Sequence, residues 1–433
     1  MSNVVSKNLL TFIKNSPSAF HSILSIEKVL KREGFTRIEE NESFNLIKGN
    51  KYYVVRNDSS IIAFKIGEEL DNYAFNIVAS HSDCPSFKIK QIEQLKGEYN
   101  RLNVEGYGGM LCATWFDRPL NIAGRVIVKE NDKLVSKFVN FNRNVASLPS
   151  VAIHFNRQAN DNATYSLATD MFPTLSLGNK PFKEILANEL NVDVNSILQH
   201  DLFLINNQEG YFWGIDDEFM SSPKLDDLQC AYTTLLGFVK SNNKHNISVY
   251  CCFDNEEVGS TTRQGANSNF LDNVLNRIND SLGKTKNDFY KAIANSFMIS
   301  ADNAHAIHPN HVEFTDSENK VYMNKGIVIK FNASQSYTSD SLSSSIFTKI
   351  CENVNVPVQY FSNKSGIRGG STLGNISNSH VSLLSVDIGL AQLAMHSACE
   401  TSGTVDNEYM VNAIKEFYSS VILFDKNEVT ITK

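Results

Sequence analysis

The chain has 433 residues, of which 42% are hydrophobic and 20% are charged, and its net charge at neutral pH is −7. A chain of this length is too long to fold around one ordinary hydrophobic core, so we expect a soluble globular protein with two or three domains. The acidic balance and the lack of a Lys/Arg cluster exclude nucleic acid as the main partner, and the strand-length apolar runs exclude a membrane span.

The seven cysteines are scattered along the chain, and no Cys-x-x-Cys pair occurs. This usage is typical of free buried thiols and argues against a disulfide framework or a cysteine-type zinc site. The N-terminal residues lack the apolar core of a secretory signal and have the pattern of an amphipathic helix. We therefore expect a cytoplasmic protein.

The first 80 or so residues have the pattern of helices followed by strands. Apolar side chains at helical spacing predict one or two helices over residues 4–34. His81 and Asp83 follow the last of the next β-type runs, and this His-x-Asp pair suits a metal ligand with a carboxylate that orients it. An ordinary loop histidine is the alternative. The β-type runs are 43–47, 51–56, 60–65 and 73–79.

The pattern changes over residues 91–222. Short alternating segments such as 123–129 lack a strand-then-helix rhythm, which predicts an inserted β-rich domain. Within it, residues 181–202 have a helical, polar pattern, and residues 150–157 predict a short strand that carries His154. Taken alone, His154 fits a packed or surface histidine.

The alternation of helices and strands resumes at residue 223, where two carboxylates are adjacent in the sequence. Asp226 and Asp227 open an amphipathic helix, where capping is the ordinary role of aspartate and metal bridging is the alternative. The apolar run 247–253 predicts a buried strand that leads into Glu256 and Glu257. Because neighbouring carboxylates on a loop point in different directions, one can hold a metal while the other handles a proton. A solvated acidic turn is the alternative.

Further strands in the C-terminal half also end near polar residues. The run 297–301 precedes Asp302, and the run 382–388 is followed by His396. We also expect helices near 286–295 and from Thr338 to about 354, strands at 325–331 and 356–361, a glycine-rich loop over 366–374, and a last helix at 407–421 capped by Asp406.

These positions predict one site. In a mostly parallel sheet, the carboxyl ends of the strands converge on a single edge, which is where ligands bind. Histidine and carboxylate ligands suit a pair of hard-to-borderline divalent ions. Two ions bridged by a carboxylate and a water would clamp an attacking hydroxide and a carbonyl. The residues expected at this edge are His81, Asp226, Glu256, Glu257, Asp302 and His396.

Several sequence blocks resemble one known family, in the family's order and over nearly the whole chain. They are HSDCP (81–85), EGYGG with TWFDR (105–118), SPKLDDL (222–228), FDNEEVGS (253–260), SADNAHAIHPN (300–310), GGSTLG (369–374) and VDIGLAQLAMHS (386–397). Together they resemble the aspartyl aminopeptidase family of dinuclear zinc metallopeptidases.

The resemblance implies a zinc-exopeptidase-like α/β fold, with a mixed, mostly parallel sheet flanked by helices. Residues 1–90 and 223–433 would form this catalytic domain, and the insert 91–222 would be a β-rich dimerisation domain. Asp226 would bridge two divalent ions per subunit, which are zinc in the family, with Mn²⁺ or Co²⁺ as alternatives. The implied ligands are His81, Asp226, Glu257, Asp302 and His396.

The resemblance also implies roles around the metals. Glu256 would be the general base and acid, and Asp83 would orient a ligand. His154 would reach into a neighbouring subunit's site to steady the oxyanion, within an assembly that resembles the family's tetrahedral dodecamer. Lys330 and His305 would contact the substrate.

The implied activity is removal of N-terminal acidic residues, Asp or Glu, from short peptides. The segment 334–337 lacks the arginine that the family has there, which leaves Lys330 as the candidate partner of a substrate carboxylate. A dinuclear amidohydrolase or deacylase of small amides is one alternative, and it would not need a free amine. A non-catalytic shell-forming binding protein is the other, and it would carry less than one metal per chain.

Overall fold

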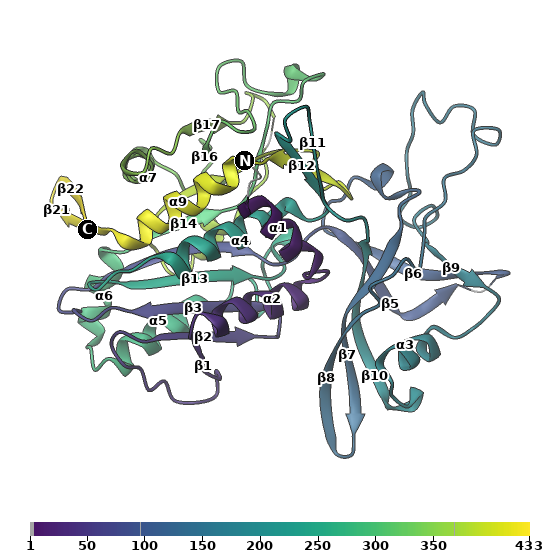
Figure 1. Ribbon diagram of the computed structural model, residues 1–433, viewed down its shortest axis with the longest axis horizontal. Coiled ribbons are helices and arrows are strands. Elements are labelled where there is room, and N and C mark those ends of the chain that lie inside the picture. Colours follow the sequence, from purple (N-terminus) through teal and green to yellow (C-terminus); the bar gives the residue numbers. More distant parts are fainter. Residues whose placement is uncertain (1–3, 96, 368) are drawn as a thin grey trace.

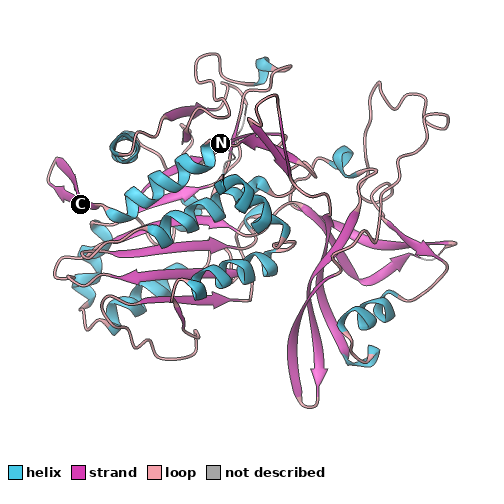
Figure 2. Ribbon diagram, in the orientation of Figure 1, coloured by secondary structure: helices cyan, strands magenta, loops and turns pink. Residues whose placement is uncertain are grey.

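The computed structural model describes residues 4–95, 97–367 and 369–433 and contains two large sheets. A nine-stranded sheet lies between helical layers, and a six-stranded sheet stands to one side of it (Figure 1). The helices of the larger unit run roughly along its strands, whereas the second unit is mostly strand and loop (Figure 2). Among the described residues, no helix combines the length and apolar character needed to cross a bilayer.

The central sheet is mixed and mostly parallel, which confirms the predicted fold class. Strands β13, β4, β14 and β18 lie side by side and run parallel, whereas β3 and β16 pair antiparallel with their inner neighbours. In spatial order the strands are β1 (Thr36–Arg37), β2 (Lys51–Arg56), β3 (Ser60–Ile66), β13 (Ile247–Phe253), β4 (Phe75–His81), β14 (Phe297–Ala301), β18 (Leu384–Gly389), β16 (Ile327–Phe331) and β17 (Val358–Ser362).

The inner strands form because both of their faces are covered. Every residue of β4, β13 and β14 is buried, so these strands read as continuous apolar runs. Along β13, Tyr250 faces the core under one helical layer, and Val249 faces the core under the other. The helices are α1 (Val4–Lys14), α2 (Ala19–Arg32), α3 (Phe182–Leu190), α4 (Leu225–Lys240), α5 (Phe270–Ser281), α6 (Lys286–Ala294), α7 (Ser341–Asn353), α8 (Leu373–Ser377) and α9 (Asp406–Ser419).

The second sheet has its own hydrophobic core, which includes Phe87, Ile122 and Leu204. All its strand pairs are antiparallel, and Phe182 and Leu186 of α3 belong to the same core. Its strands, in spatial order, are β8 (Lys133–Asn140), β7 (Leu120–Glu130), β10 (Ile197–Asn206), β5 (Ser86–Leu95), β6 (Tyr99–Tyr107) and β9 (Thr174–Leu177).

A smaller five-stranded sheet links segments that are far apart in the chain. It pairs the strand just before α4 with strands from the C-terminal third, which brings Asp226 close to the loop that carries His396. Its strands are β11 (Tyr211–Trp213), β12 (Phe219–Ser222), β20 (Glu400–Gly403), β19 (Ala391–Leu393) and β15 (Ala304–His305), and a hairpin of β21 (Val421–Asp425) and β22 (Glu428–Thr432) ends the chain.

Two predicted strands are wrong. Residues 43–47 form no strand, because the amides of Leu46 and Ile47 bond to the side chains of Ser281 and Tyr52 instead of to a neighbouring strand. Residues 150–157 form turns, and His154 is exposed there. Neither segment, 43–47 or 150–157, has a partner strand among the described residues.

The helix predicted over 181–202 ends at Leu190, and Ile197–Asn206 form β10 instead. Pairing with β7 and β5 overrides the local helical pattern. Asp406 does not cap its own helix but accepts from the backbone amides of Asn324 and Gly326. The expected loop over 366–374 contains residue 368, which lies outside the described residues, and its end forms the start of α8.

Candidate metal centre

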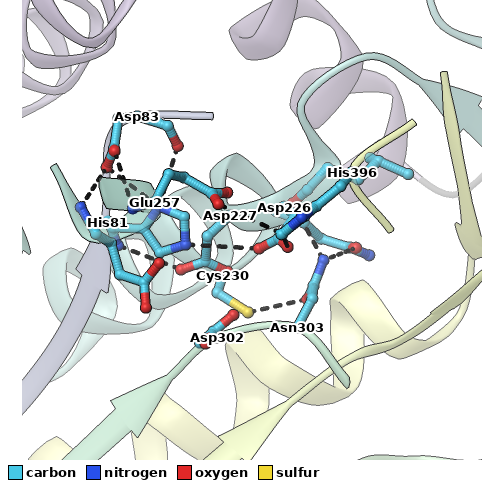
Figure 3. A network of polar contacts seen from close by, with 12 residues as sticks. His81, Asp83, Asp226, Asp227, Cys230, Glu257, Asp302, Asn303 and His396 are labelled. Carbon is cyan, nitrogen blue, oxygen red and sulfur yellow. Dashed lines mark hydrogen bonds and ion pairs between the residues drawn. The ribbon is translucent and has the colours of Figure 1, made fainter. Parts of the chain in front are cut away.

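Acidic and histidine side chains converge at the carboxyl ends of the inner strands (Figure 3). His81 is the last residue of β4, and Asp302 directly follows β14. Glu256 and Glu257 lie in the 3₁₀ turn η3 (Glu256–Val258), which follows β13. Because β13, β4 and β14 are parallel neighbours, these residues meet at one edge of the sheet.

Asp226 lies at the centre of the cluster. Its Oδ1 is 3.5 Å from His81 Nε2, and its Oδ2 is 3.5 Å from His396 Nε2. His396 Nε2 is also 3.4 Å from Glu257 Oε2. One carboxylate therefore faces two histidines. Sets of ligand atoms within 4.8 Å of one another, each able to hold a metal, are His81–Asp226–Asp227–Asp302, His81–Glu256–Glu257 and Asp226–Glu257–His396.

The tautomers of both histidines follow from their backbone partners. His81 Nδ1 lies 3.0 Å from the carbonyl oxygen of Asp83, and His396 Nδ1 lies 2.8 Å from that of Gly109. Because a carbonyl can only accept, each Nδ1 carries a proton, and in the neutral imidazole Nε2 is the nitrogen that offers a lone pair. Both Nε2 atoms face Asp226, so both can act as metal ligands.

Buried carboxylate oxygens without hydrogen-bond partners indicate that the cluster suits a cation. Asp226 Oδ1, Asp227 Oδ1 and Glu257 Oε1 are buried and have no hydrogen-bond partner among the described residues. Leaving buried carboxylate oxygens unpaired is costly, and a cation removes that cost. The mixed oxygen and nitrogen donors also match the ligands that Zn²⁺ takes. The residues present therefore fit a metal site.

Asp83 and Glu400 support the cluster from behind. The Asp83 carboxylate accepts from the backbone amides of Glu256 and Glu257, at 3.1 and 3.2 Å. Glu400 accepts from the amides of Asp226 and His396, at 3.0 and 2.7 Å. Glu400 is 1% exposed, and burial raises its pKa to about 8. The sequence analysis missed Glu400, because nothing in its local pattern distinguishes it from other surface-prone glutamates.

Asp227 also belongs to the centre, although the expected ligand set includes only Asp226 of this pair. Its Oδ2 accepts from the amide of His81 at 3.3 Å, and burial raises its pKa. Asp226 and Asp227 both have non-helical backbone angles, and the N-cap position of α4 is occupied by Lys224. Neither aspartate caps the helix, so both carboxylates are available to the site.

A cavity of about 200 Å³ opens beside the cluster. Lys330 lines it, and its Nζ donates to the carbonyl oxygens of Asp302 and Asn303 at 2.7 and 3.2 Å. His305 lines it next to the ring of Phe361. His154 is not among the residues that line the cavity, so the structure does not bring it to the site of its own chain.

The metal-free cluster holds extra protons. Burial raises the pKa of Glu256 to about 8 and raises the pKa of Glu257 and Asp302 as well. For His396, burial alone lowers the pKa, but Asp226 outweighs it and raises the pKa to about 9. Between about pH 4.5 and 8 these groups therefore bind more protons in the folded metal-free chain than in the unfolded chain.

These shifts predict how the metal-free protein responds to pH. Its unfolding free energy should fall as the pH rises from 5 to 8, with Glu256 contributing on the order of a few kcal/mol. Thermal melts of the chelator-treated protein measure this slope. The stabilisation by added Zn²⁺ should grow over the same range, because bound metal displaces the protons. A metal-free midpoint that rises with pH would contradict the assignment of these protons.

Comparison with known proteins connects this site to an enzyme family. A family model described as Aminopeptidase I zinc metalloprotease (M18) matches residues 12–418. The chain belongs to the M18 family of zinc metallo-aminopeptidases. Membership makes it a zinc metallo-aminopeptidase, which is a hydrolase.

Relatives of the M18 family match almost the full chain. The Probable M18 family aminopeptidase 2 of Clostridium novyi is 46% identical over 422 residues, which cover 95% of this chain and 98% of that protein. The protein of the same name from Ectopseudomonas mendocina is 35% identical and covers 96% of this chain and 98% of its own length.

Solved structures share the fold. The cryo-EM structure of the Ape4 and Nbr1 complex matches with a TM-score of 0.93 at 33% identity, covering 96% of this chain and 85% of that one. The crystal structure of prApe1 matches with a TM-score of 0.91 at 26% identity, covering 95% and 94%. These M18 structures confirm the architecture predicted from the sequence.

Proposed function

We propose that this M18 enzyme is a dinuclear aminopeptidase that removes single residues from the free N-termini of short peptides. The observation that carries the proposal is the Asp226 carboxylate, whose two oxygens face His81 and His396 separately. When bound, the two ions polarise the scissile carbonyl and activate a water. The residues that would hold them are His81, Asp226, Glu257, Asp302 and His396, and zinc is the ion that the family description names.

Glu256 is the proposed general base and acid. It lines the cavity beside the cluster, and Asp83 holds its backbone amide in place. Its carboxylate would take a proton from the attacking water and pass it to the leaving amine. In the metal-free site, burial raises the pKa of Glu256, which makes its carboxylate a better proton acceptor than an exposed glutamate.

The lining of the cavity supports an exopeptidase with an acidic preference. The carboxylates around the cavity can hold the substrate's α-ammonium group, which a blocked N-terminus lacks. Among the described lining residues, Lys330 is the one lysine or arginine, and we propose it as the partner of an Asp or Glu side chain. His305 lies on the same wall and would contact the substrate.

We further propose that the chains assemble through the insert 91–222. A solved structural neighbour is the S. cerevisiae mApe1 dodecamer, which has a TM-score of 0.83 and 25% identity over 96% of each chain. In this chain, Val151, Ile153 and Phe155 are exposed on the loop between β8 and β9. The same loop carries His154, which would act on a neighbouring subunit's site. The seven free cysteines support a cytoplasmic location.

A substrate panel on the metal-loaded protein tests this function. We expect hydrolysis of aminoacyl-anilides, fastest for Asp and Glu, and no hydrolysis of the matching N-acyl compounds. Static light scattering on the same sample should give a mass near twelve chains. Equal rates for free and N-acylated substrates would refute the exopeptidase proposal, and faster cleavage of Leu or Lys anilides would refute the acidic preference.

A further inference from the structure

A short segment at the end of β6 connects the second sheet to the metal centre. Tyr107 is the last residue of β6, and its hydroxyl donates to Asp83 Oδ2 at 2.7 Å. The same hydroxyl accepts from Asn255 Nδ2 at 2.8 Å. The ring of Tyr107 packs edge-on against Phe203 of β10, with ring centroids 5.4 Å apart. Tyr107 thus connects strand β10 of the second sheet to Asp83, the residue that contacts His81.

The next two residues pass directly behind the cluster. Gly108 has a φ of +76°, and a Cβ placed on it would lie 3.1 Å from the Cβ of Glu257. Only glycine fits this conformation at this distance without strain. The carbonyl of Gly109 accepts from His396 Nδ1, and the amide of Leu111 donates to the carbonyl of His396 at 3.0 Å.

Asp83 transmits the contact with Tyr107 to the cluster. Its two carboxylate oxygens accept from the amides of Glu256 and Glu257, and its own carbonyl accepts from His81 Nδ1. In Figure 3, Asp83 stands next to His81 and above the glutamate turn. The carboxylate oxygen Oδ1 of Asp83 also lies 3.5 Å from His81 Nδ1. A change in the angle of this carboxylate would therefore affect both the glutamate turn and His81.

We infer that the segment Tyr107–Gly109 is a positioning element through which the second sheet orients both histidines of the metal centre. Tyr107 acts through Asp83 on His81, and the Gly109 carbonyl acts on His396. The affinity of the site for its ions therefore depends on how the second sheet is docked, although this sheet supplies none of the proposed ligands. The inference rests on the proposed dinuclear function and names the part of the fold that sets its metal affinity.

The variant Tyr107→Phe tests this inference, because it removes the hydroxyl and keeps the ring against Phe203. Tyr99→Phe is the matched control, since Tyr99 lies on the same strand and is 60% exposed. Zn²⁺ affinity, measured by chelator competition on the full chain, should fall by about 10- to 100-fold in Tyr107→Phe and stay unchanged in Tyr99→Phe. The visible absorption spectrum of the Co²⁺-loaded Tyr107→Phe protein should also shift, because His81 and Glu257 are reoriented.

Thermal midpoints of the metal-free proteins separate positioning from simple support of the fold. We expect the metal-free midpoint of Tyr107→Phe to stay close to that of the unaltered chain. An unchanged Zn²⁺ affinity and Co²⁺ spectrum would overturn the inference, as would equal losses in the metal-free and metal-loaded midpoints. If the unaltered chain itself binds no Zn²⁺ at this site, the proposed function fails first, and that result is distinct from failure of the variant alone.

Discussion

Replacing Glu256 with glutamine is expected to lower kcat by about 10²- to 10⁴-fold, which is the usual contribution of a positioned general base. The amide occupies the same space but cannot accept a proton from the attacking water. The backbone amide of Glu256 donates a hydrogen bond to the Asp83 carboxylate. Because this bond does not involve the Glu256 side chain, the turn that carries Glu257 should keep its shape. The zinc content should therefore remain that of the unaltered enzyme.

Glu68→Gln is a suitable control for this experiment, because Glu68 is exposed and its carboxylate lies 3.8 Å from the ammonium group of the exposed Lys244. It should retain full kcat and full metal content. Both variants need metal analysis and kinetics on the same preparation. If Glu256→Gln keeps near-normal turnover, another group carries the proton and the base assignment is wrong.

Replacing Asp226 with asparagine should remove both activity and tight metal binding. The amide offers one neutral oxygen where the carboxylate offers two charged ones, and those two oxygens face His81 and His396 separately. We expect the Zn²⁺ affinity to fall by at least about 100-fold, the upper range seen when the support of a metal site is removed. The rise in thermal midpoint on adding Zn²⁺ should shrink accordingly, because ligand stabilisation follows the ratio of free ligand to Kd.

The matched control is Asp132→Asn, at an exposed turn between β7 and β8. It should show the same metal-induced rise in midpoint as the unaltered protein. Because the substitution at Asp226 is isosteric, the metal-free protein should still fold. A normal zinc-induced rise in Asp226→Asn would show that Asp226 does not bridge the ions.

The central sheet could be predicted because its inner strands are buried on both faces. Continuous apolar runs at 247–253 and 297–301 mark strands whose ends must hold the polar residues that follow. That rule alone gathers Glu256, Glu257 and Asp302 at one edge. The predicted strand at 43–47 failed because strand identity depends on a neighbouring strand, and the amides there bond to side chains instead.

The supporting residues of the site could not be predicted, because their roles exist only in three dimensions. Glu400 accepts from the amides of two residues, one of which is 174 positions away in the chain. Tyr107 contacts Asp83 because strand β6 of the second sheet ends next to the edge of the central sheet that carries Asp83. The helix α5 is a different case. It is not among the predicted helices, although Phe270, Val274 and Ile278 have clear helical spacing.

The central claim is that two ions lie on either side of the Asp226 carboxylate. Anomalous diffraction at the zinc edge from crystals of the Zn²⁺-loaded protein measures this directly. Two peaks are expected, one beside His81 and Asp302 and the other beside His396 and Glu257, both next to Asp226. Peaks located away from Asp226, or a fully loaded protein with a single peak that contacts only one of the two histidines, would contradict this account.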